Sequence, residues 1–198
     1  GELRRAAWQK AVIQMMTKGV TRRPHFRIAV GAEVLRNVGF VAQELLDLDF
    51  TPEELKAGLF HARELKAIGF EAEALKKLGY KPKDMCEAKV PARELKALHY
   101  TAMALHEGGY SAPQLREAKY QLAELKEARY KVAECKDAGF RCDEIRGVKF
   151  TATEVRRSHA FTAPDMREAG YEASEMKKAG FDATRIQAAG YSALEATD

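Results

Sequence analysis

The sequence is short of cysteine and of long hydrophobic runs. Its 198 residues include three cysteines, Cys86, Cys135 and Cys142. This small, odd number argues against a disulfide framework and predicts a reducing intracellular compartment. No apolar run approaches the roughly 18 to 20 residues that a membrane-spanning helix needs. We therefore expect no transmembrane segment.

Motifs of catalysis, nucleotide binding and metal binding are missing as well. The sequence contains no Gly-x-Gly-x-x-Gly, Walker loop, Gly-x-Ser-x-Gly or His-Glu-x-x-His. Cys135 and Cys142 do not form a Cys-x-x-Cys pair, and the histidines form no recurring ligand geometry. These absences predict a protein that is not an enzyme and that holds no metal or cofactor.

What the sequence has instead is a ten-residue repeat, visible in the two similar halves of FTPEELKAGLFHARELKAIGF, Phe50 to Phe70. The repeats start at every tenth residue from Val30 to Phe150. One inserted residue near Ala160 then moves the later starts to Phe161, Tyr171, Phe181 and Tyr191. The first position is nearly always Phe or Tyr, the sixth is always apolar, and the tenth is often Gly. A fixed short period of this kind indicates a repeat architecture.

The chemistry of each repeat predicts a helix that starts and stops quickly. Thr51 is a candidate N-cap, Pro52 suits the first helical position, and Glu54 completes a capping box. Phe50 can then pack against Leu55 as a hydrophobic staple. Glycine at the tenth position supplies the left-handed conformation that ends a helix. We expect one helix of about seven residues in each repeat.

Helices this short are marginal in water when isolated, so the repeats must share buried surface. The predicted fold is an all-α solenoid of about 16 to 17 repeats, each with one short capped helix. Residues 1–29 form a basic N-terminal helix and linker in this prediction, with a longer capping helix over Leu3 to Met16. Residues 30–198 form the solenoid, with an eleven-residue repeat at 150–160. The predicted core includes Phe50, Leu55, Phe60, Leu65, Phe70, Leu75, Leu95, Leu115 and Leu125.

An aromatic and a leucine five residues apart are also typical of the pentapeptide-repeat β-helix. That fold needs a small, inward-facing residue two places before each inward apolar residue. The sequence has charged residues there instead, at Glu53, Arg63, Glu73, Lys83 and Arg93. A buried ladder of such charges is costly, which favours the α-solenoid. A β-helix interaction protein is the third interpretation of the chain.

The consensus repeat, aromatic-Thr/Ser-Ala-x-Glu-Leu-Lys-x-Ala-Gly, resembles the tandem decapeptide repeats of large proteins from protists and some bacteria. The resemblance covers nearly the whole chain from Val30 onward. It implies an elongated all-α scaffold, and no active-site residues carry over from it.

Positive charge is concentrated near the N-terminus, where residues 1–40 hold eight basic and two acidic side chains. Arg22, Arg23 and Arg27 are candidate contacts to RNA or to an acidic protein surface. This Arg-rich, acid-poor start also resembles a segment next to an organellar targeting peptide, which points to a mitochondrion or another organelle.

Lysine or arginine is also common at the seventh position. Lys56, Lys66, Lys76 and Lys96 form a candidate basic row for RNA or a partner. The alternative is that these cations only complement the C-terminal ends of their own helices. On the second interpretation the Leu95 side chain faces inward and Lys96 outward, so replacing Lys96 should cost little stability.

These observations favour a non-catalytic structural scaffold that binds other protein subunits along an extended repeat surface, within a larger multisubunit assembly. The alternative partner is RNA, bound by the basic N-terminal segment, as in an accessory protein of an organellar ribosome. Asp198 comes before the last repeat is complete. We therefore expect a partner chain to cover the C-terminal repeat.

Overall fold

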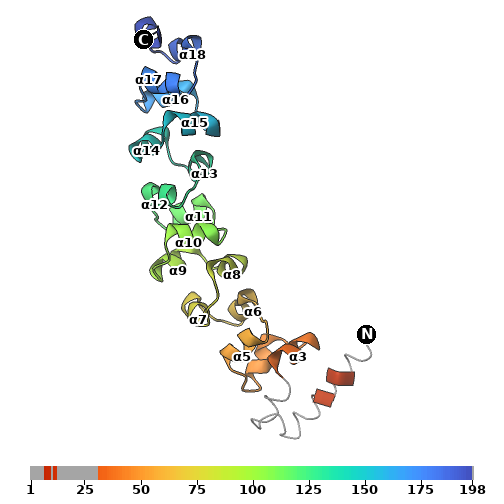
Figure 1. Ribbon diagram of the computed structural model, residues 1–198. Helices are drawn as coiled ribbons and strands as arrows, with labels where there is room; N and C mark the ends of the chain where they lie inside the picture. Colours follow the sequence, from red (N-terminus) through yellow and green to blue (C-terminus); the bar gives the residue numbers. More distant parts are fainter. Residues whose placement is uncertain (1–6, 10, 13–30, 198) are drawn as a thin grey trace. The chain divides into compact units, whose positions relative to one another are not determined.

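The computed structural model describes residues 7–9, 11–12 and 31–197. In this part of the chain all regular structure is helical and there are no strands (Figure 1). The prediction of an all-α solenoid is confirmed, and the β-helix alternative is wrong for these residues. The chain divides into two compact units, 1–90 and 91–198. Each is described by itself.

Short helices follow one another with a period of ten residues in both units. In the first unit they are α3 (Ala32–Asn37), α4 (Ala42–Leu46), α5 (Pro52–Ala57), α6 (Ala62–Ala67), α7 (Ala72–Lys77) and α8 (Pro82–Glu87). In the second unit they are α9 (Ala92–Ala97), α10 (Ala102–Glu107), α11 (Ala112–Glu117), α12 (Leu122–Glu127), α13 (Val132–Asp137), α14 (Cys142–Gly147), α15 (Ala152–Ser158), α16 (Ala163–Glu168), α17 (Ala173–Lys178), α18 (Ala183–Ala188) and α19 (Ala193–Thr197).

The N-terminal helix predicted over Leu3 to Met16 lies only partly in the described residues. Residues 7–9 and 11–12 are helical, and the remaining residues of the range lie outside the described part. The Gln9 side chain donates from Nε2 to the Val38 carbonyl oxygen at 2.8 Å, at the C-terminal end of α3. Val12 is 1% exposed. This segment therefore contacts the first repeat of the solenoid.

Each helix starts at an extended residue in the second position of its repeat. At α5 the Glu54 amide donates to Thr51 Oγ1 at 3.2 Å, and the Thr51 amide donates to Glu54 Oε2 at 2.7 Å. At α6 the second position is His61, yet its amide still donates to Glu64 Oε2 at 2.7 Å. The acid at the fifth position therefore satisfies an orphan amide even where the N-cap side chain cannot accept a bond.

Each regular helix ends in a Schellman turn, which uses the residues after its last helical turn. At α3 the Phe40 amide donates to the Leu35 carbonyl at 3.0 Å, and the Gly39 amide donates to the Arg36 carbonyl at 2.9 Å. The tenth position has positive φ, at Gly39 and also at non-glycine residues such as Leu59, with φ 62°. The turn shortens most helices to six residues and brings each aromatic next to the preceding leucine.

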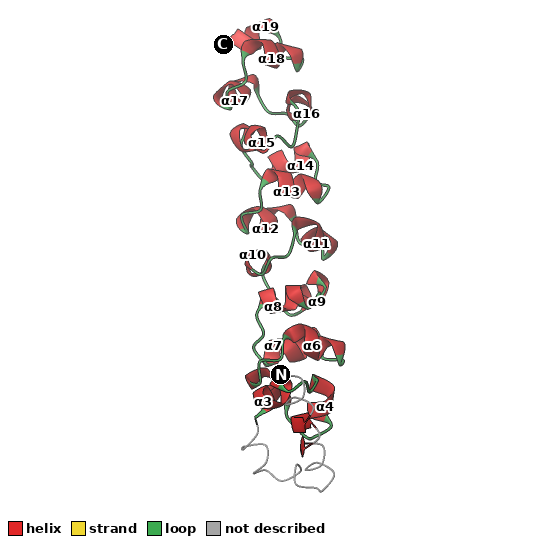
Figure 2. Cartoon of the chain, turned by 90° about the vertical axis from the view of Figure 1, so that its right-hand side faces the viewer, coloured by secondary structure: helices red, strands yellow, loops and turns green. Residues whose placement is uncertain are grey.

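Within each unit, successive helices lie alternately on two sides, and helices two repeats apart pack on one another. In the first unit α6 packs on α8. In the second unit α11 packs on α13, and α15 packs on α17 (Figure 2). We call a set of helices stacked in this way a column. One full coil of the solenoid is therefore twenty residues with two helices, one in each column.

The sixth-position side chains form the centre of each coil. Leu55, Leu65, Leu75, Leu95, Leu115 and Leu125 are all 0% exposed. The first-position aromatics Phe50 and Phe60 lie beside them and are 4% and 2% exposed. These predicted core residues are therefore buried.

Phe70 is the exception among the predicted core residues, because it is only half-buried. Tyr100 and Phe161 are half-buried as well, so full burial does not extend to every first-position ring. The prediction that Phe70 belongs to the fully buried core is corrected accordingly.

The eleven-residue repeat at 150–160 accommodates its extra residue at the end of α15. This helix has seven residues, and His159 then takes the left-handed conformation with φ 53°. The Ser158 hydroxyl donates to the Val155 carbonyl at 2.6 Å and accepts from the Ala160 amide at 3.1 Å. The hydroxyl thus bridges the two groups that bond directly in regular repeats. The column continues, because α15 packs on both α13 and α17.

The central leucines give the first prediction. Leu95→Ala should lower the free energy of unfolding by about 2 to 4 kcal/mol because it leaves a cavity that the surroundings cannot fill. The loss should spread to neighbouring repeats, since a solenoid has no other core. Urea unfolding followed by circular dichroism measures it. Leu59→Ala is the control, because Leu59 is 57% exposed; equal losses would contradict the assigned faces.

Candidate functional site

Where a repeat starts with tyrosine, the hydroxyl can connect it to the repeat two earlier in the same column, as five tyrosines do. Tyr80 donates to the Phe60 carbonyl at 2.5 Å in the first unit. In the second unit the same bond joins Tyr120 to the Tyr100 carbonyl at 2.5 Å, Tyr130 to the Tyr110 carbonyl at 2.5 Å, Tyr171 to the Phe150 carbonyl at 2.7 Å, and Tyr191 to the Tyr171 carbonyl. These hydroxyls therefore stabilise the packing of one repeat on another.

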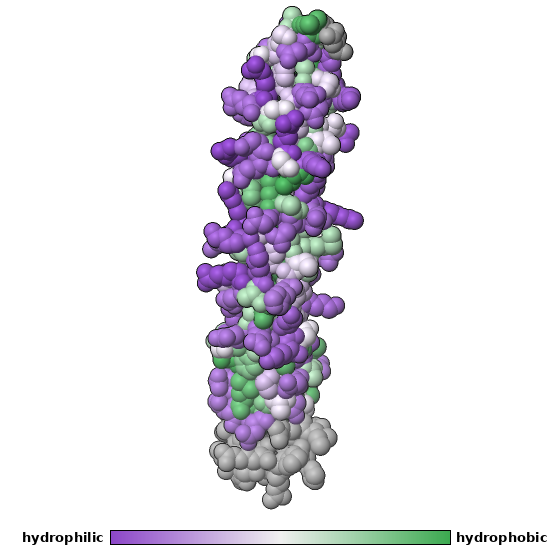
Figure 3. Space-filling model, turned by 90° about the vertical axis from the view of Figure 1, so that its left-hand side faces the viewer, coloured by the Kyte–Doolittle hydropathy of each residue, from purple (hydrophilic) through white to green (hydrophobic). Residues whose placement is uncertain are grey.

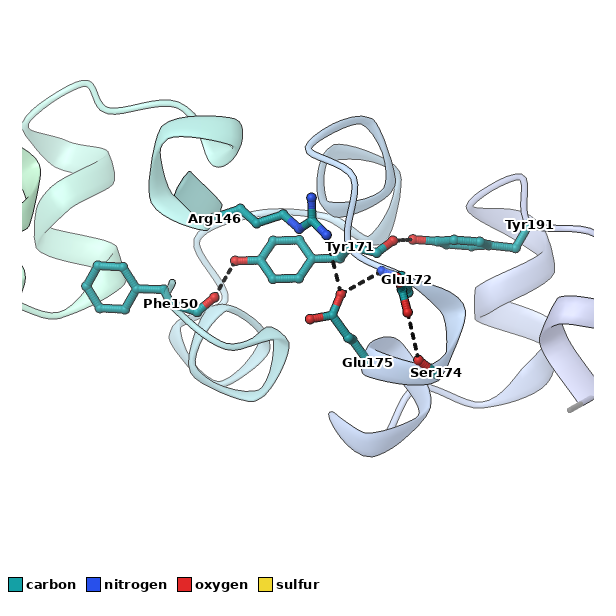
Figure 4. A network of polar contacts seen from close by, with 7 residues as sticks. All are labelled: Arg146, Phe150, Tyr171, Glu172, Ser174, Glu175 and Tyr191. Atoms are coloured by element: carbon teal, nitrogen blue, oxygen red, sulfur yellow. Dashed lines mark hydrogen bonds and ion pairs between the residues drawn. The ribbon is translucent and has the colours of Figure 1, made fainter. Parts of the chain in front are cut away.

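Figure 4 shows how these contacts continue along one column. The Tyr171 hydroxyl bonds the Phe150 carbonyl, and the Tyr171 carbonyl accepts the hydroxyl of Tyr191. The Arg146 guanidinium lies 5.5 Å from the centre of the Tyr171 ring and 3.8 Å from the Glu175 carboxylate. Burial raises the pKa of Tyr171 well above its ordinary value. The ring is thus held between a carbonyl and a cation.

The seventh-position cations bind the end of the helix two repeats further on. Lys56 Nζ donates to the Leu78 carbonyl at 2.5 Å, Lys66 to the Lys89 carbonyl at 2.6 Å, and Lys96 to the Lys119 carbonyl at 2.5 Å. Lys76 also has an interaction partner. Carbonyls at a helix C-terminus lack partners within the helix and favour a positive charge. The candidate basic row therefore has a structural role within each column.

The same cations lie over the first-position aromatic rings. Lys96 Nζ is 4.4 Å from the centre of the Tyr120 ring, and Lys56 Nζ is 5.2 Å from that of Tyr80. Such cation–π contacts contribute about 0.5 to 1 kcal/mol each at exposed sites. Whether these lysines also contact RNA or a protein stays a prediction. Arg22, Arg23 and Arg27 lie outside the described residues.

A groove recurs between the start of one helix and the later part of its column neighbour. One wall is formed by residues from the first four positions of one repeat. The other wall is formed by residues from the first, fifth, eighth and ninth positions of the repeat two further on. Grooves of this kind lie between α3 and α5, with a volume of about 220 Å³, and between α13 and α15, with a volume of about 440 Å³. Two more lie between α14 and α16, with a volume of about 600 Å³, and between α17 and α19, with a volume of about 540 Å³. The surface face in Figure 3 is mainly hydrophilic, with hydrophobic areas between the polar side chains.

The grooves differ in charge because variable repeat positions line them. The α13/α15 groove has Lys126, Arg129, Lys131 and Arg157 beside Glu154. The α14/α16 groove mixes Lys136 and Arg141 with Asp143, Asp165 and Glu168, and the α17/α19 groove has Glu172 and Glu195. Sequence reasoning missed the grooves because it paired each repeat with its immediate neighbour. Pairing residues twenty apart would have found them.

Two of the three cysteines, Cys135 and Cys142, are buried, and burial makes a thiol less reactive. Burial raises the pKa of Cys135, and also that of Cys142, to about 11, so both are protonated near neutral pH. Among the described residues, no three or more His, Cys, Asp or Glu side chains are grouped so that they could hold a metal ion. None of the helices in residues 31–197 is long and apolar enough to cross a membrane.

Because of these lysine contacts, we no longer expect the replacement of Lys96 to cost little stability. Lys96→Ala removes a charged hydrogen bond and a cation–π contact, so it should lower the free energy of unfolding by about 1 kcal/mol. Urea unfolding measures this effect. The matched control is Lys77→Ala, because Lys77 is largely exposed and its ion pair among the described residues is with Glu73 on its own helix. Equal, negligible losses at both sites would contradict the structural role.

Alkaline pH should unfold the protein as the buried phenols ionise. Burial raises the pKa of Tyr80 from 10.0 to about 12, and it also raises the pKa values of Tyr120 and Tyr191. A raised pKa in the folded state means that the protonated phenol stabilises the fold. This stabilisation is complete below pH 10 and is lost as the pH rises towards about 12.

Phenolate absorbance and helical circular dichroism, recorded during one titration, measure the effect. Both signals should change together, with a midpoint above the ordinary pKa of tyrosine. Ionisation of every tyrosine at its ordinary pKa, with the helices intact, would show that the hydroxyls are not held in the stack.

Comparison with known proteins agrees with this geometry. A family model described as a decapeptide repeat region matches residues 29–102 and again residues 89–160. Together the two matches cover more than half of the chain. Searches of curated proteins and of solved structures gave no significant match. The ten-residue repeats, each with one short capped helix and with contacts between alternate repeats, are those of a protein that belongs to the decapeptide repeat region family.

Proposed function

We propose that this repeat protein is a non-catalytic scaffold that binds segments of other proteins in the grooves of its columns, as a component of a larger assembly. The supporting observation is that one groove geometry recurs with different lining charges. A constant backbone with variable side chains suits recognition of different segments by neighbouring grooves. Repeat proteins generally bind through such extended surfaces.

The roles of the chemically capable side chains support binding rather than catalysis. The tyrosine hydroxyls bond carbonyls within the stack, as Tyr130 does with Tyr110. The seventh-position cations bind helix ends, and Cys135 fills a leucine position with a raised pKa. A catalytic group needs a suitable pKa and an accessible reacting atom. These side chains instead stabilise the fold.

The groove charges also favour protein partners over RNA in the described part of the chain. A nucleic-acid backbone needs a continuous row of cations, whereas the grooves carry charges of both signs. The RNA alternative depends on Arg22, Arg23 and Arg27, which the structure does not describe. We therefore place protein segments first.

Photo-crosslinking tests this proposal. A photoreactive amino acid replaces Lys131 in the α13/α15 groove or Ser174 in the α17/α19 groove, and the full chain is exposed to native extract. We expect protein crosslinks from both positions that survive ribonuclease treatment. The control replaces Gln187, which is exposed on α18 and lines none of the four grooves described. Crosslinks to RNA alone, or equal labelling from the control, would contradict binding in the grooves.

A further inference from the structure

We propose that the groove between α13 and α15 binds an acidic segment of a partner protein, with its carboxylates on the basic rim and an apolar side chain on the groove floor. This inference rests on the proposed scaffold function and adds the chemistry of one partner. The floor is formed by Tyr130, Val132 and Phe150, and the basic rim by Arg129, Lys131 and Arg157.

The rim cations lack counter-charges within the described residues. Arg129, Lys131 and Arg157 are exposed, and their side chains form no ion pair or hydrogen bond with residues 31–197. Glu154 is the acid among the residues that line the groove, and its carboxylate already accepts bonds from the Thr151 amide and hydroxyl, both at 2.7 Å. The groove therefore has an excess of positive charge that an anionic ligand can neutralise.

The fold presents these three cations from fixed backbone positions. Arg129 occupies the left-handed turn after α12, with φ 67°, and Lys131 is the N-cap residue of α13. Arg157 lies in the last turn of the seven-residue helix α15. The neighbouring Ser158 hydroxyl is held by the Val155 carbonyl and the Ala160 amide. Fixed backbone anchors of this kind lower the entropic cost of forming a site.

The floor adds a requirement for apolar contact. Tyr130 is 2% exposed, Val132 is 3% exposed and Phe150 is 6% exposed, so the groove reaches the edge of the buried core. Its volume of about 440 Å³ accommodates a few side chains. A ligand with carboxylates around one leucine or phenylalanine matches both the rim and the floor. Clusters of arginine and lysine are a recurrent means of recognising acidic motifs.

A protein segment fits this site better than a nucleic acid does. Further along the same column, the α17/α19 groove is lined by Glu172 and Glu195. A polyanion that follows the column would therefore meet negative charge soon after it leaves the basic groove. A short acidic segment uses only the basic groove and meets no such repulsion.

Binding of a labelled peptide to the full chain, measured by fluorescence anisotropy, tests the proposal. The probe is a short peptide rich in Asp and Glu around one Leu, and its counterpart carries Asn and Gln in place of the acids. We expect saturable binding of the acidic peptide alone, weakened by salt. The triple variant Arg129→Gln, Lys131→Gln, Arg157→Gln should lose at least about tenfold in affinity.

A matched variant controls for net charge. Lys119→Gln, Lys81→Gln, Lys178→Gln removes three cations from the same repeat positions outside this groove, and its affinity should stay within about twofold of the parent chain. Circular dichroism and the thermal midpoint confirm that both variants are folded. Gln also keeps a non-glycine residue in the left-handed turn at 129.

Three results would overturn the proposal: absence of binding to the acidic peptide, equal loss of affinity in both triple variants, or groove-dependent binding of single-stranded RNA at least as tight as that of the peptide. The proposed scaffold function fails separately. If the peptide does not bind but the crosslinks from positions 131 and 174 reach a protein, the grooves bind partners of another chemistry.

Discussion

The structure depends on packing between helices two repeats apart, which the seventh-position cations reinforce at the helix ends. A six-residue helix leaves most of its carbonyls without partners in the helix, and it is too short to stand alone. Lys56, Lys96 and their equivalents supply a bond to those carbonyls and cover an aromatic ring with the same side chain. Because this contact spans two repeats, it reinforces the stacking of alternate helices into columns around the buried leucines.

Different positions of the repeat have different roles, which explains why the grooves share one geometry but differ in charge. The first, sixth, seventh and tenth positions build the stack, through the aromatic ring, the leucine, the cation and the left-handed turn. The second, fourth and eighth positions are left to vary, and they line the grooves between column neighbours. Lys131 and Arg157 make one groove basic, and Glu172 makes another acidic, on nearly the same backbone. Binding specificity can therefore change without any change in the fold.

Most of the fold could be predicted from local features of the sequence. Thr51, Pro52 and Glu54 predict a helix start, Gly69 predicts a helix end, and the regular leucines predict a shared core. The pairing of alternate repeats could not be predicted, because equivalent residues offer the same contacts to every neighbour. Lys66 and Lys96 were therefore predicted to contact RNA, a partner or the end of their own helix, although they bind carbonyls of a later repeat. Phe70 was misjudged because the first positions are not uniformly buried: Phe60 is buried, whereas Phe70 and Tyr100 are half-buried.

The two columns have a consequence for how such a chain can grow. Loss or duplication of one ten-residue repeat preserves every type of contact, but it transfers all later repeats to the opposite column. An even number of repeats must be gained or lost if grooves on either side of the change are to keep their relative sides. The extra residue at 150–160 escapes this parity rule, because the Ser158 hydroxyl spans the gap and α15 stays between α13 and α17. Small insertions at helix ends are thus tolerated where single-repeat changes would rearrange the binding surface.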